Sequence, residues 1–188
     1  MAKSSISLIN IDKDIILELQ NKVDTSAKDI DMLVDKLVND YCKPLNDYMQ
    51  FIQGILEDIN QPPIESELDD FMMNLPVLLY FTGEAQEAVG VREDIAKALR
   101  QEIYNKSYEK ADGTVADKTA ISEMASRNEY IVQIVYQRAY KVIKNKMESA
   151  SELLQSVKKV VTRRMSEYEL SKVDPGRITK NAGFRIIN

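Results

Sequence analysis

The chain has 188 residues, 44% of them hydrophobic and 29% charged, with a formal net charge of −5, which suits one folded domain with its own core. It contains no histidine and a single cysteine, Cys42, which excludes histidine-based general bases, Ser-His-Asp and Cys-His nucleophiles, histidine-ligated metals and internal disulfides. Six glycines, five prolines and no tryptophan are typical of a helical protein.

The net charge of −5 is the sum of two opposite halves. Residues 1–90 carry 6 Lys and Arg against 17 Asp and Glu, a net of −11, whereas residues 91–188 carry 19 against 13, a net of +6. Such a split is expected when one half binds a charged partner, and also when both halves only expose solvated helix faces.

The acidic residues 1–63 are predicted to form a small helical bundle. Apolar residues at helical spacing indicate three helices, over residues 11–23, 26–41 and 44–59. Ser26 and Asp29 have the spacing of a capping box that opens the second helix, and Pro44 is expected to end it. The segment Gln61-Pro62-Pro63 marks a boundary, because neither proline fits a helix interior.

A second helical region is predicted from residue 64 onward. Ser66 and Asp69 again have capping-box spacing. The apolar segment 71–81 indicates a buried core helix with a kink at Pro76, because its 11 residues are too few for a membrane span of about 20. The periodicity resumes at Val91 and continues to the Asp112-Gly113 turn signal.

The last helix is predicted to be the longest. Thr114 and Asp117 form a further capping box, and no Pro or Gly occurs from Asp117 to Leu170. An apolar stripe in steps of three and four residues follows the coiled-coil period. We therefore expect an all-α protein in which residues 64–170 form a long antiparallel helical hairpin or coiled coil. The last helix should outrun its partner, which favours self-association.

Residues 171–188 form a basic tail after the Asp174-Pro175-Gly176 turn. Two interpretations stay open: a solvated tail, or a docking peptide that binds a neighbouring subunit, the protein's own groove or nucleic acid. The presence of Phe184, Ile186 and Ile187 favours docking, because solvated tails rarely keep so much apolar surface.

No motif for catalysis or metal binding is found. The glycines match no phosphate-binding loop, residues 112–123 lack the ligands of a calcium loop, and the acidic residues 65–70 are explained by the dipole of a helix N-terminus. Cys42 is expected to be a packing residue. We therefore expect no enzyme, no cofactor, no metal ion and no membrane association, in a cytoplasmic protein (the host cytoplasm if it is phage-encoded).

Basic residues interleaved with tyrosines indicate nucleic-acid binding. Cations that follow phosphates and tyrosines that stack on bases are what a sequence-tolerant single-strand site requires. In a hairpin, residues 98–113 and 136–146 could approach each other. The candidate binding residues are Arg100, Tyr104, Lys106, Tyr108, Lys110, Arg138, Lys141, Lys144 and Lys146. The alternative is that the tyrosines are half-buried and the lysines only extend over them.

Three segments, ALRQEIYNKSYEKADG, KTAISEM and YQRAYKVIKNKMESASELL, carry a resemblance to a known family. With them, residues 75–170 resemble the phage UvsY family of recombination mediators. The resemblance implies a ring-like homo-oligomer that binds single-stranded DNA and helps a RecA-type recombinase to displace single-strand-binding protein. Arg100 stands at the first basic position of the family's Lys-x-Arg signature, Glu102 at the second, and Tyr108 where the family has glycine.

Two hypotheses follow. The first is a non-enzymatic recombination mediator that binds single-stranded DNA as a homo-oligomer, with a RecA-type recombinase and single-strand-binding protein as further partners. The second is a helical structural or adaptor protein that binds only protein, such as a virion assembly component or an inhibitor of a host factor.

Overall fold

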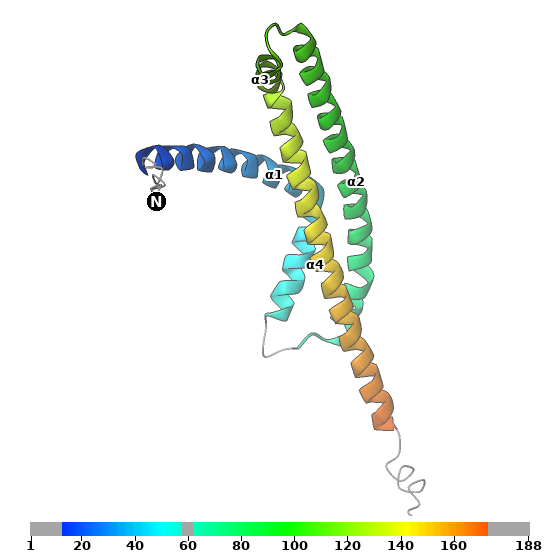
Figure 1. Ribbon diagram of the computed structural model, residues 1–188. Helices are drawn as coiled ribbons and strands as arrows, with labels where there is room; N and C mark the ends of the chain where they lie inside the picture. The colour runs from blue at the N-terminus through cyan, green and yellow to red at the C-terminus, as the bar shows by residue number, and fades with distance from the viewer. Residues whose placement is uncertain (1–12, 58–61, 173–188) are drawn as a thin grey trace, which may run out of the picture. The chain divides into compact units, whose positions relative to one another are not determined.

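The structure, a computed structural model, describes residues 13–57 and 62–172. This part of the chain is all-α, as predicted, and holds no strand (Figure 1). Its helices are α1 (Lys13–Leu56), α2 (Glu65–Lys110), α3 (Val115–Ala125) and α4 (Arg127–Lys172). The three long helices α1, α2 and α4 pack together, and the most extensive pairing is that of α2 with α4.

The chain divides into two compact units. Unit 1 consists of Met1–Tyr41 and Glu87–Val142, and unit 2 of Cys42–Gln86 and Ile143–Asn188. Each of the three long helices therefore contributes one part to each unit, while the short helix α3 belongs to unit 1 alone.

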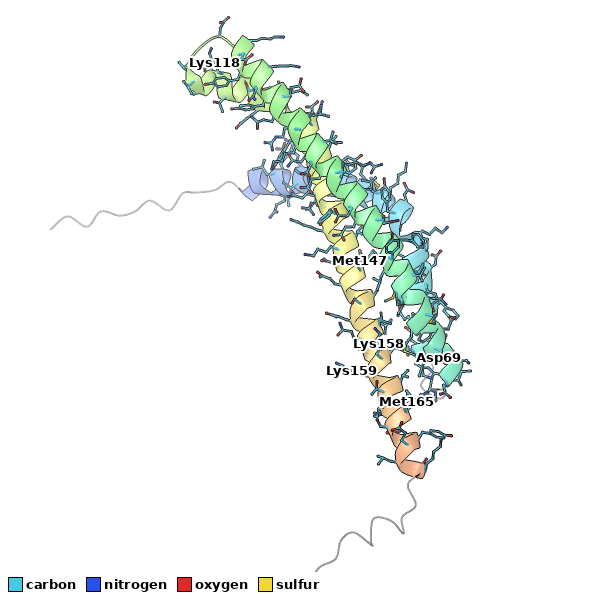
Figure 2. The ribbon with its side chains drawn as sticks, turned by 90° about the vertical axis from the view of Figure 1, so that its right-hand side faces the viewer. Asp69, Lys118, Met147, Lys158, Lys159 and Met165 are labelled. Carbon is cyan, nitrogen blue, oxygen red and sulfur yellow. The ribbon has the colours of Figure 1, made fainter. Side chains whose placement is uncertain are left out.

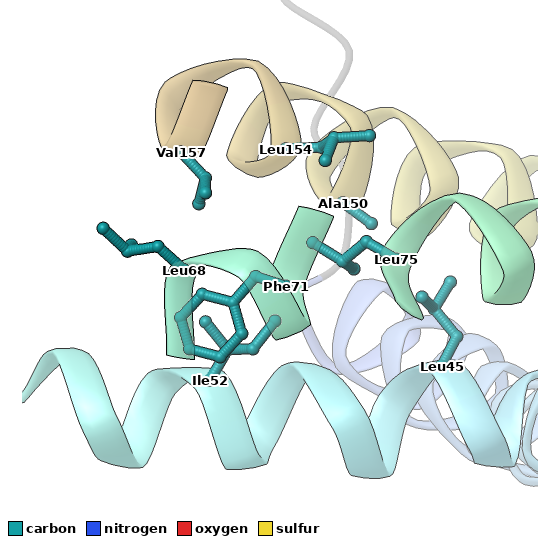
Figure 3. Packing of buried hydrophobic residues seen from close by; sticks show 8 residues of the cluster. All are labelled: Leu45, Ile52, Leu68, Phe71, Leu75, Ala150, Leu154 and Val157. Carbon is teal, nitrogen blue, oxygen red and sulfur yellow. The ribbon is translucent and has the colours of Figure 1, made fainter. Parts of the chain in front are cut away.

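Unit 2 holds an apolar core between its three helix segments (Figure 3). Every helix presents residues spaced three, four or seven apart, the spacing of one helix face. The core residues are Leu45, Ile52, Leu68, Phe71, Leu75, Ala150, Leu154 and Val157. Phe71 is fully buried and meets the Tyr48 ring edge-on at 6.5 Å. Burying each large apolar side chain contributes about 1.5–3 kcal/mol, so this cluster is the main source of stability in unit 2.

In unit 1, α2 and α4 run antiparallel. Gly90 faces the ring of Tyr140, and Arg100 covers the ring of Tyr130. Ten residues forward along α2 thus correspond to ten residues backward along α4. Small residues allow this approach, since Val89, Ala96 and Ala139 are buried in this unit.

The predicted N-terminal bundle of three helices is wrong, because α1 is one continuous helix over residues 13–56. Ser26 does not open a second helix, because it lies inside α1, and the hydroxyl of the neighbouring Thr25 donates to the carbonyl of Asn21, one turn earlier, at 2.8 Å. Pro44 lies inside α1, although proline costs a helix interior about 3 kcal/mol. Cys42 and Leu45 on either side of it are buried, so packing offsets that cost. Residues 58–61, which include the predicted helix end, lie outside the described residues.

The prediction of one unbroken helix over residues 117–170 is also wrong. The helix is divided at Ser126 into α3 and α4. Ser122 and Ser126 are buried, and the Ser126 hydroxyl donates to the carbonyl of Ser122 at 2.9 Å. The backbone N–H of Ser126 still donates to the carbonyl of Ser122 at 3.1 Å, so the interruption is confined to Ser126 itself, whose φ of −96° and ψ of 10° depart from helical values.

The boundaries of α2 differ from the expected cap by two residues. The helix starts at Glu65, and the backbone N–H of Ile64 donates to the carboxylate of Glu67 at 2.9 Å. Ser66 and Asp69 are therefore helical residues and not the capping box. α2 continues through Pro76, Gly83 and Gly90 to the predicted turn. No helix of the described part is long and apolar enough to cross a membrane.

Candidate nucleic-acid interface

The last four turns of α2, in unit 1, carry planar side chains in one row. Arg100, Tyr104 and Tyr108 follow one another at four-residue spacing, so they share a helix face, and all three are half-buried. The rings of Tyr104 and Tyr108 stack with centroids 6.2 Å apart and planes 18° apart. The sequence predicted tyrosines that stack on bases, and here the two rings stack on each other.

Arg100 is fixed by α4. Its guanidinium lies 4.1 Å from the centroid of the Tyr130 ring, and its Nη1 donates to Oε1 of Gln133 at 3.3 Å. A cation over a tyrosine face contributes about 0.5–1 kcal/mol at an exposed site. Tyr130 and Gln133 were not predicted from the sequence, because no local pattern indicates which α4 residues lie opposite Arg100.

Lys106 and Lys110 lie on the same turns of α2 as Tyr104 and Tyr108 but on a different face of the helix, and both are exposed. With three further residues, Ser107, Ala111 and Ile121, they line a hollow of about 350 Å³ next to the α2–α3 turn. Lys106 forms an ion pair with Glu102 of the same helix, which lowers the pKa of that carboxyl group. Glu102 stands where the Lys-x-Arg signature has its second basic residue. Here it pairs within the same helix with Lys106, one of the candidate binding residues.

The turn beside this hollow is built as predicted. Gly113 has a φ of +115°, a backbone conformation that favours glycine. Thr114 caps α3: its hydroxyl accepts from the N–H of Asp117 at 3.3 Å, and the Asp117 carboxylate accepts from the Thr114 backbone at 3.0 Å. The hydrogen bonds from Thr114 lower the pKa of Asp117. The turn therefore holds the end of α2 and the start of α3 in a defined arrangement.

Arg138 and Lys141 also belong to unit 1, but they lie apart from the candidate residues at the end of α2. Tyr140, between them, contacts Gly90, and Arg100 lies ten residues further along α2, a helix length of about 15 Å. Arg138 instead lines a hollow of about 400 Å³ with residues of α1, among them Leu19, Val23 and Ile30. The expectation that the two basic sets approach each other is therefore wrong for these residues.

Lys144 and Lys146 belong to unit 2. Lys144 lies 3.8 Å from the Glu148 carboxylate. Lys146 is half-buried, and its Nζ donates to Oδ1 of Asn46 on α1 at 2.9 Å. Lys146 therefore holds α4 to α1, a structural contact that the sequence pattern could not distinguish from a phosphate contact.

Sequence reasoning missed an apolar groove of about 350 Å³ in unit 1 between α2 and α4. Its lining residues are Arg92, Ile95, Ala96, Leu99, Asn128, Glu129, Val132 and Tyr136. Oε2 of Glu129 is buried and has no hydrogen-bond partner among the described residues. Ile95 and Leu99 belong to the apolar periodicity that resumes at Val91, and they are 54% and 49% exposed. Their spacing signals an apolar helix face and cannot show whether that face is covered.

Cys42 is fully buried, as a packing residue is expected to be. Burial raises the pKa of its thiol, and the Lys146 ammonium opposes this rise only in part. The thiolate is therefore disfavoured. Comparisons with protein-family models, with curated proteins and with solved structures found no match.

Proposed function

We propose that the protein is a non-enzymatic, single-stranded DNA-binding accessory protein of recombination that acts as a homo-oligomer and helps to load a RecA-type recombinase in the presence of single-strand-binding protein. The observation that carries this proposal is the end of α2. There the stacked Tyr104 and Tyr108 and the exposed Lys106 and Lys110 lie on the same turns of one helix, on different faces. A single strand that wraps around this end of the helix would meet both planar rings and cations, the combination that binds single strands without sequence preference.

The cations at this end of α2 are available at low cost. The ion pair of Lys106 with Glu102 is exposed, and such a pair adds little to stability because water and salt screen it. A phosphate can replace the carboxylate, and the released counterions favour binding. Lys110 has no ion-pair partner among the residues that the structure describes.

The homo-oligomer follows from the apolar surface of the hairpin. We propose that α2 and α4 form a long antiparallel hairpin of coiled-coil type that leaves part of its apolar stripe for a second copy. Val91, Ile95 and Leu99 form an exposed row on α2, 57%, 54% and 49% accessible. Single exposed apolar residues are common, but a contiguous row indicates association.

The test is binding of a labelled oligonucleotide over a salt series. The double variant Lys106→Ala/Lys110→Ala should bind more weakly and should lower the slope of log K against log salt by about 1.4, because each phosphate contact on a single strand contributes about 0.7. Lys22→Ala is the matched control, since Lys22 forms an equivalent exposed pair with Glu18 four residues away. No binding at low salt, or a slope unchanged by the double variant, would contradict the proposal.

The groove of unit 1 favours a second candidate, a helical assembly protein that binds only protein. It is apolar, with Ile95, Leu99 and Val132 exposed along it, and it needs no nucleic acid. In this case an oligomer forms without DNA and persists in high salt, because apolar contacts are not screened. Sedimentation at low and high salt, with and without the oligonucleotide, separates the two candidates.

A further inference from the structure

A second hollow, of about 460 Å³, opens in unit 2 between the first turns of α2 and the last turns of α4. It is lined by Glu65, Leu68, Val161, Arg164, Met165 and Tyr168. Leu68 is buried, whereas Met165 and Tyr168 are 60% and 63% exposed. Figure 2 shows Asp69 on α2 and Met165 on α4 in this part of unit 2.

At this end of unit 2, α4 extends past the first residue of α2, and the hollow lies where the pairing of the two helices ends. Glu65, the first residue of α2, and Arg164 line the same hollow, and α4 continues for about two turns beyond Arg164 to Lys172. Tyr168 and Leu170 in this overhang are 63% and 70% exposed. Met165 and Tyr168, three residues apart on one face of α4, are exposed beside this open hollow, which indicates a missing partner.

The two sides of the hollow differ in charge. The α2 side is acidic, because the first two turns of α2 carry Glu65, Glu67, Asp69 and Asp70. The α4 side carries Arg164, whose Nη1 donates to the carbonyl of Pro63 at 2.9 Å, and Lys172, which stacks on the Tyr168 ring. The partner that fits this hollow is therefore an apolar segment whose positive charge lies on the α2 side.

Residues 173–188 have this composition and follow α4 directly. They lie outside the described residues, and their sequence carries three basic residues against one acidic residue, with Phe184, Ile186 and Ile187 close together. The Asp174-Pro175-Gly176 turn signal favours a reversal of the chain. From Gly176 to Phe184 an extended chain covers about 26 Å, more than the roughly 16 Å of helix between Val161 and Lys172.

We propose that residues 177–187 fold back along α4 of the same chain and dock in this hollow, with Phe184 as the apolar anchor beside Leu68 and Met165. Arg185 would face the acidic start of α2. The segment is tethered a few residues from the hollow, so its effective concentration is of the order of millimolar. This contact would cover the overhang of α4 and keep the basic segment away from other partners.

The test uses the full chain with Phe184 replaced by the photoreactive residue p-benzoylphenylalanine. Irradiation should link position 184 to residues 161–168 or 65–68 within one chain, a product that runs as a monomer on a denaturing gel and is mapped by mass spectrometry. Met165→Lys should reduce this product by about tenfold, because it removes an apolar contact of the hollow and adds a cation that repels the basic segment.

Met124→Lys in α3 is the matched control, because Met124 is another exposed methionine, 79% accessible, and it should leave the product unchanged. Three results would overturn the proposal: no crosslink above background, crosslinks to other parts of the chain, or a product found only as a covalent dimer. The last result would assign the segment to a neighbouring copy. None of them bears on oligonucleotide binding at the end of α2.

Discussion

Gly90 on α2 lies against the ring of Tyr140 on α4, so that a Cβ atom added at Gly90 would be 3.3 Å from Cε2 of that ring. Glycine inside a helix costs about 0.5–1 kcal/mol relative to alanine. At this position the cost is offset by the close approach of the two helices. A ring that packs on bare backbone also limits how the two helices can slide past each other.

Three Gly→Ala variants should therefore differ in a fixed order. A Cβ at Gly54 meets nothing within 4 Å, one at Gly83 meets the flexible Met147 at 3.4 Å, and one at Gly90 meets the Tyr140 ring. Gly54→Ala should raise the free energy of unfolding by up to about 1 kcal/mol, Gly83→Ala by less, and Gly90→Ala should lower it. Denaturant unfolding at one protein concentration checks the order, and a stabilising Gly90→Ala would contradict the packing described here.

The cap of α3 gives a prediction with a pH dependence. Thr114→Ala removes the capping hydroxyl and should cost about 1 kcal/mol at neutral pH. The pKa of Asp117 is lowered by its bonds from Thr114, so this carboxylate stabilises the fold above its unfolded pKa of about 3.9. That stabilisation is lost as the pH falls through the lower, folded value. The stability difference between wild type and Thr114→Ala should therefore shrink in acid.

Thr119→Ala is the control for the cap. Thr119 lies inside α3, and its hydroxyl donates to the carbonyl of Val115. The same substitution there should be neutral or slightly stabilising, because alanine is the better helix former. Equal losses at positions 114 and 119 would show that the cap has no special role.

Alanine substitution of two phenylalanines of α2 should change the stability by very different amounts. Phe71 is fully buried in the core of unit 2, whereas Phe81 is 59% exposed. Phe71→Ala should lower the free energy of unfolding by about 3–5 kcal/mol, because it removes buried surface and leaves a cavity. Phe81→Ala should stay within about 0.5 kcal/mol in the monomer. A larger loss of stability for Phe81→Ala that depends on the protein concentration would show instead that this face belongs to an oligomer.

Turns and helix caps were predictable from the sequence where a few neighbouring residues determine them. The Gly113 turn and the Thr114–Asp117 cap follow from a few neighbouring residues, and both are present. The continuity of α1 through Pro44 was not predictable, because it depends on packing against residues far along the chain. The interruption at Ser126 was missed as well, because serines with the same hydroxyl-to-carbonyl bond, such as Ser156 and Ser166, lie inside the unbroken α4.

The candidate site was predictable as a list of residues and not as an arrangement. The sequence indicated Tyr104, Tyr108 and the neighbouring lysines. It could not indicate that Arg100 is fixed by Tyr130, or that Lys146 bonds to Asn46 on another helix. Such partners lie about 30 to 100 residues away in the sequence, and only the register of the helices brings them together.

Cys42 should be unreactive in the folded protein. Burial raises the pKa of its thiol, and only the thiolate reacts with disulfide reagents. The native protein should therefore react with a thiol reagent at pH 8 far more slowly than the unfolded protein does, with a rate that follows opening of the fold. Rapid, complete labelling under native conditions would contradict the burial of Cys42 between the helices of unit 2.

Substitutions of the tyrosines at the end of α2 distinguish base stacking from charge attraction in the proposed binding of single strands. Tyr108→Leu keeps the apolar contact with Tyr104 but removes the ring, and should weaken oligonucleotide binding by about 1–3 kcal/mol if a base stacks there. Tyr108→Phe keeps the ring and should bind normally. Neither variant should change the salt slope, because neither removes a cation. Tyr80→Leu, at an exposed position of α2 in unit 2, is the control for the loss of a tyrosine. If Tyr108→Leu binds like wild type while Lys106→Ala/Lys110→Ala does not, the strand is held by charge alone, and the stacked pair serves only to pack α2.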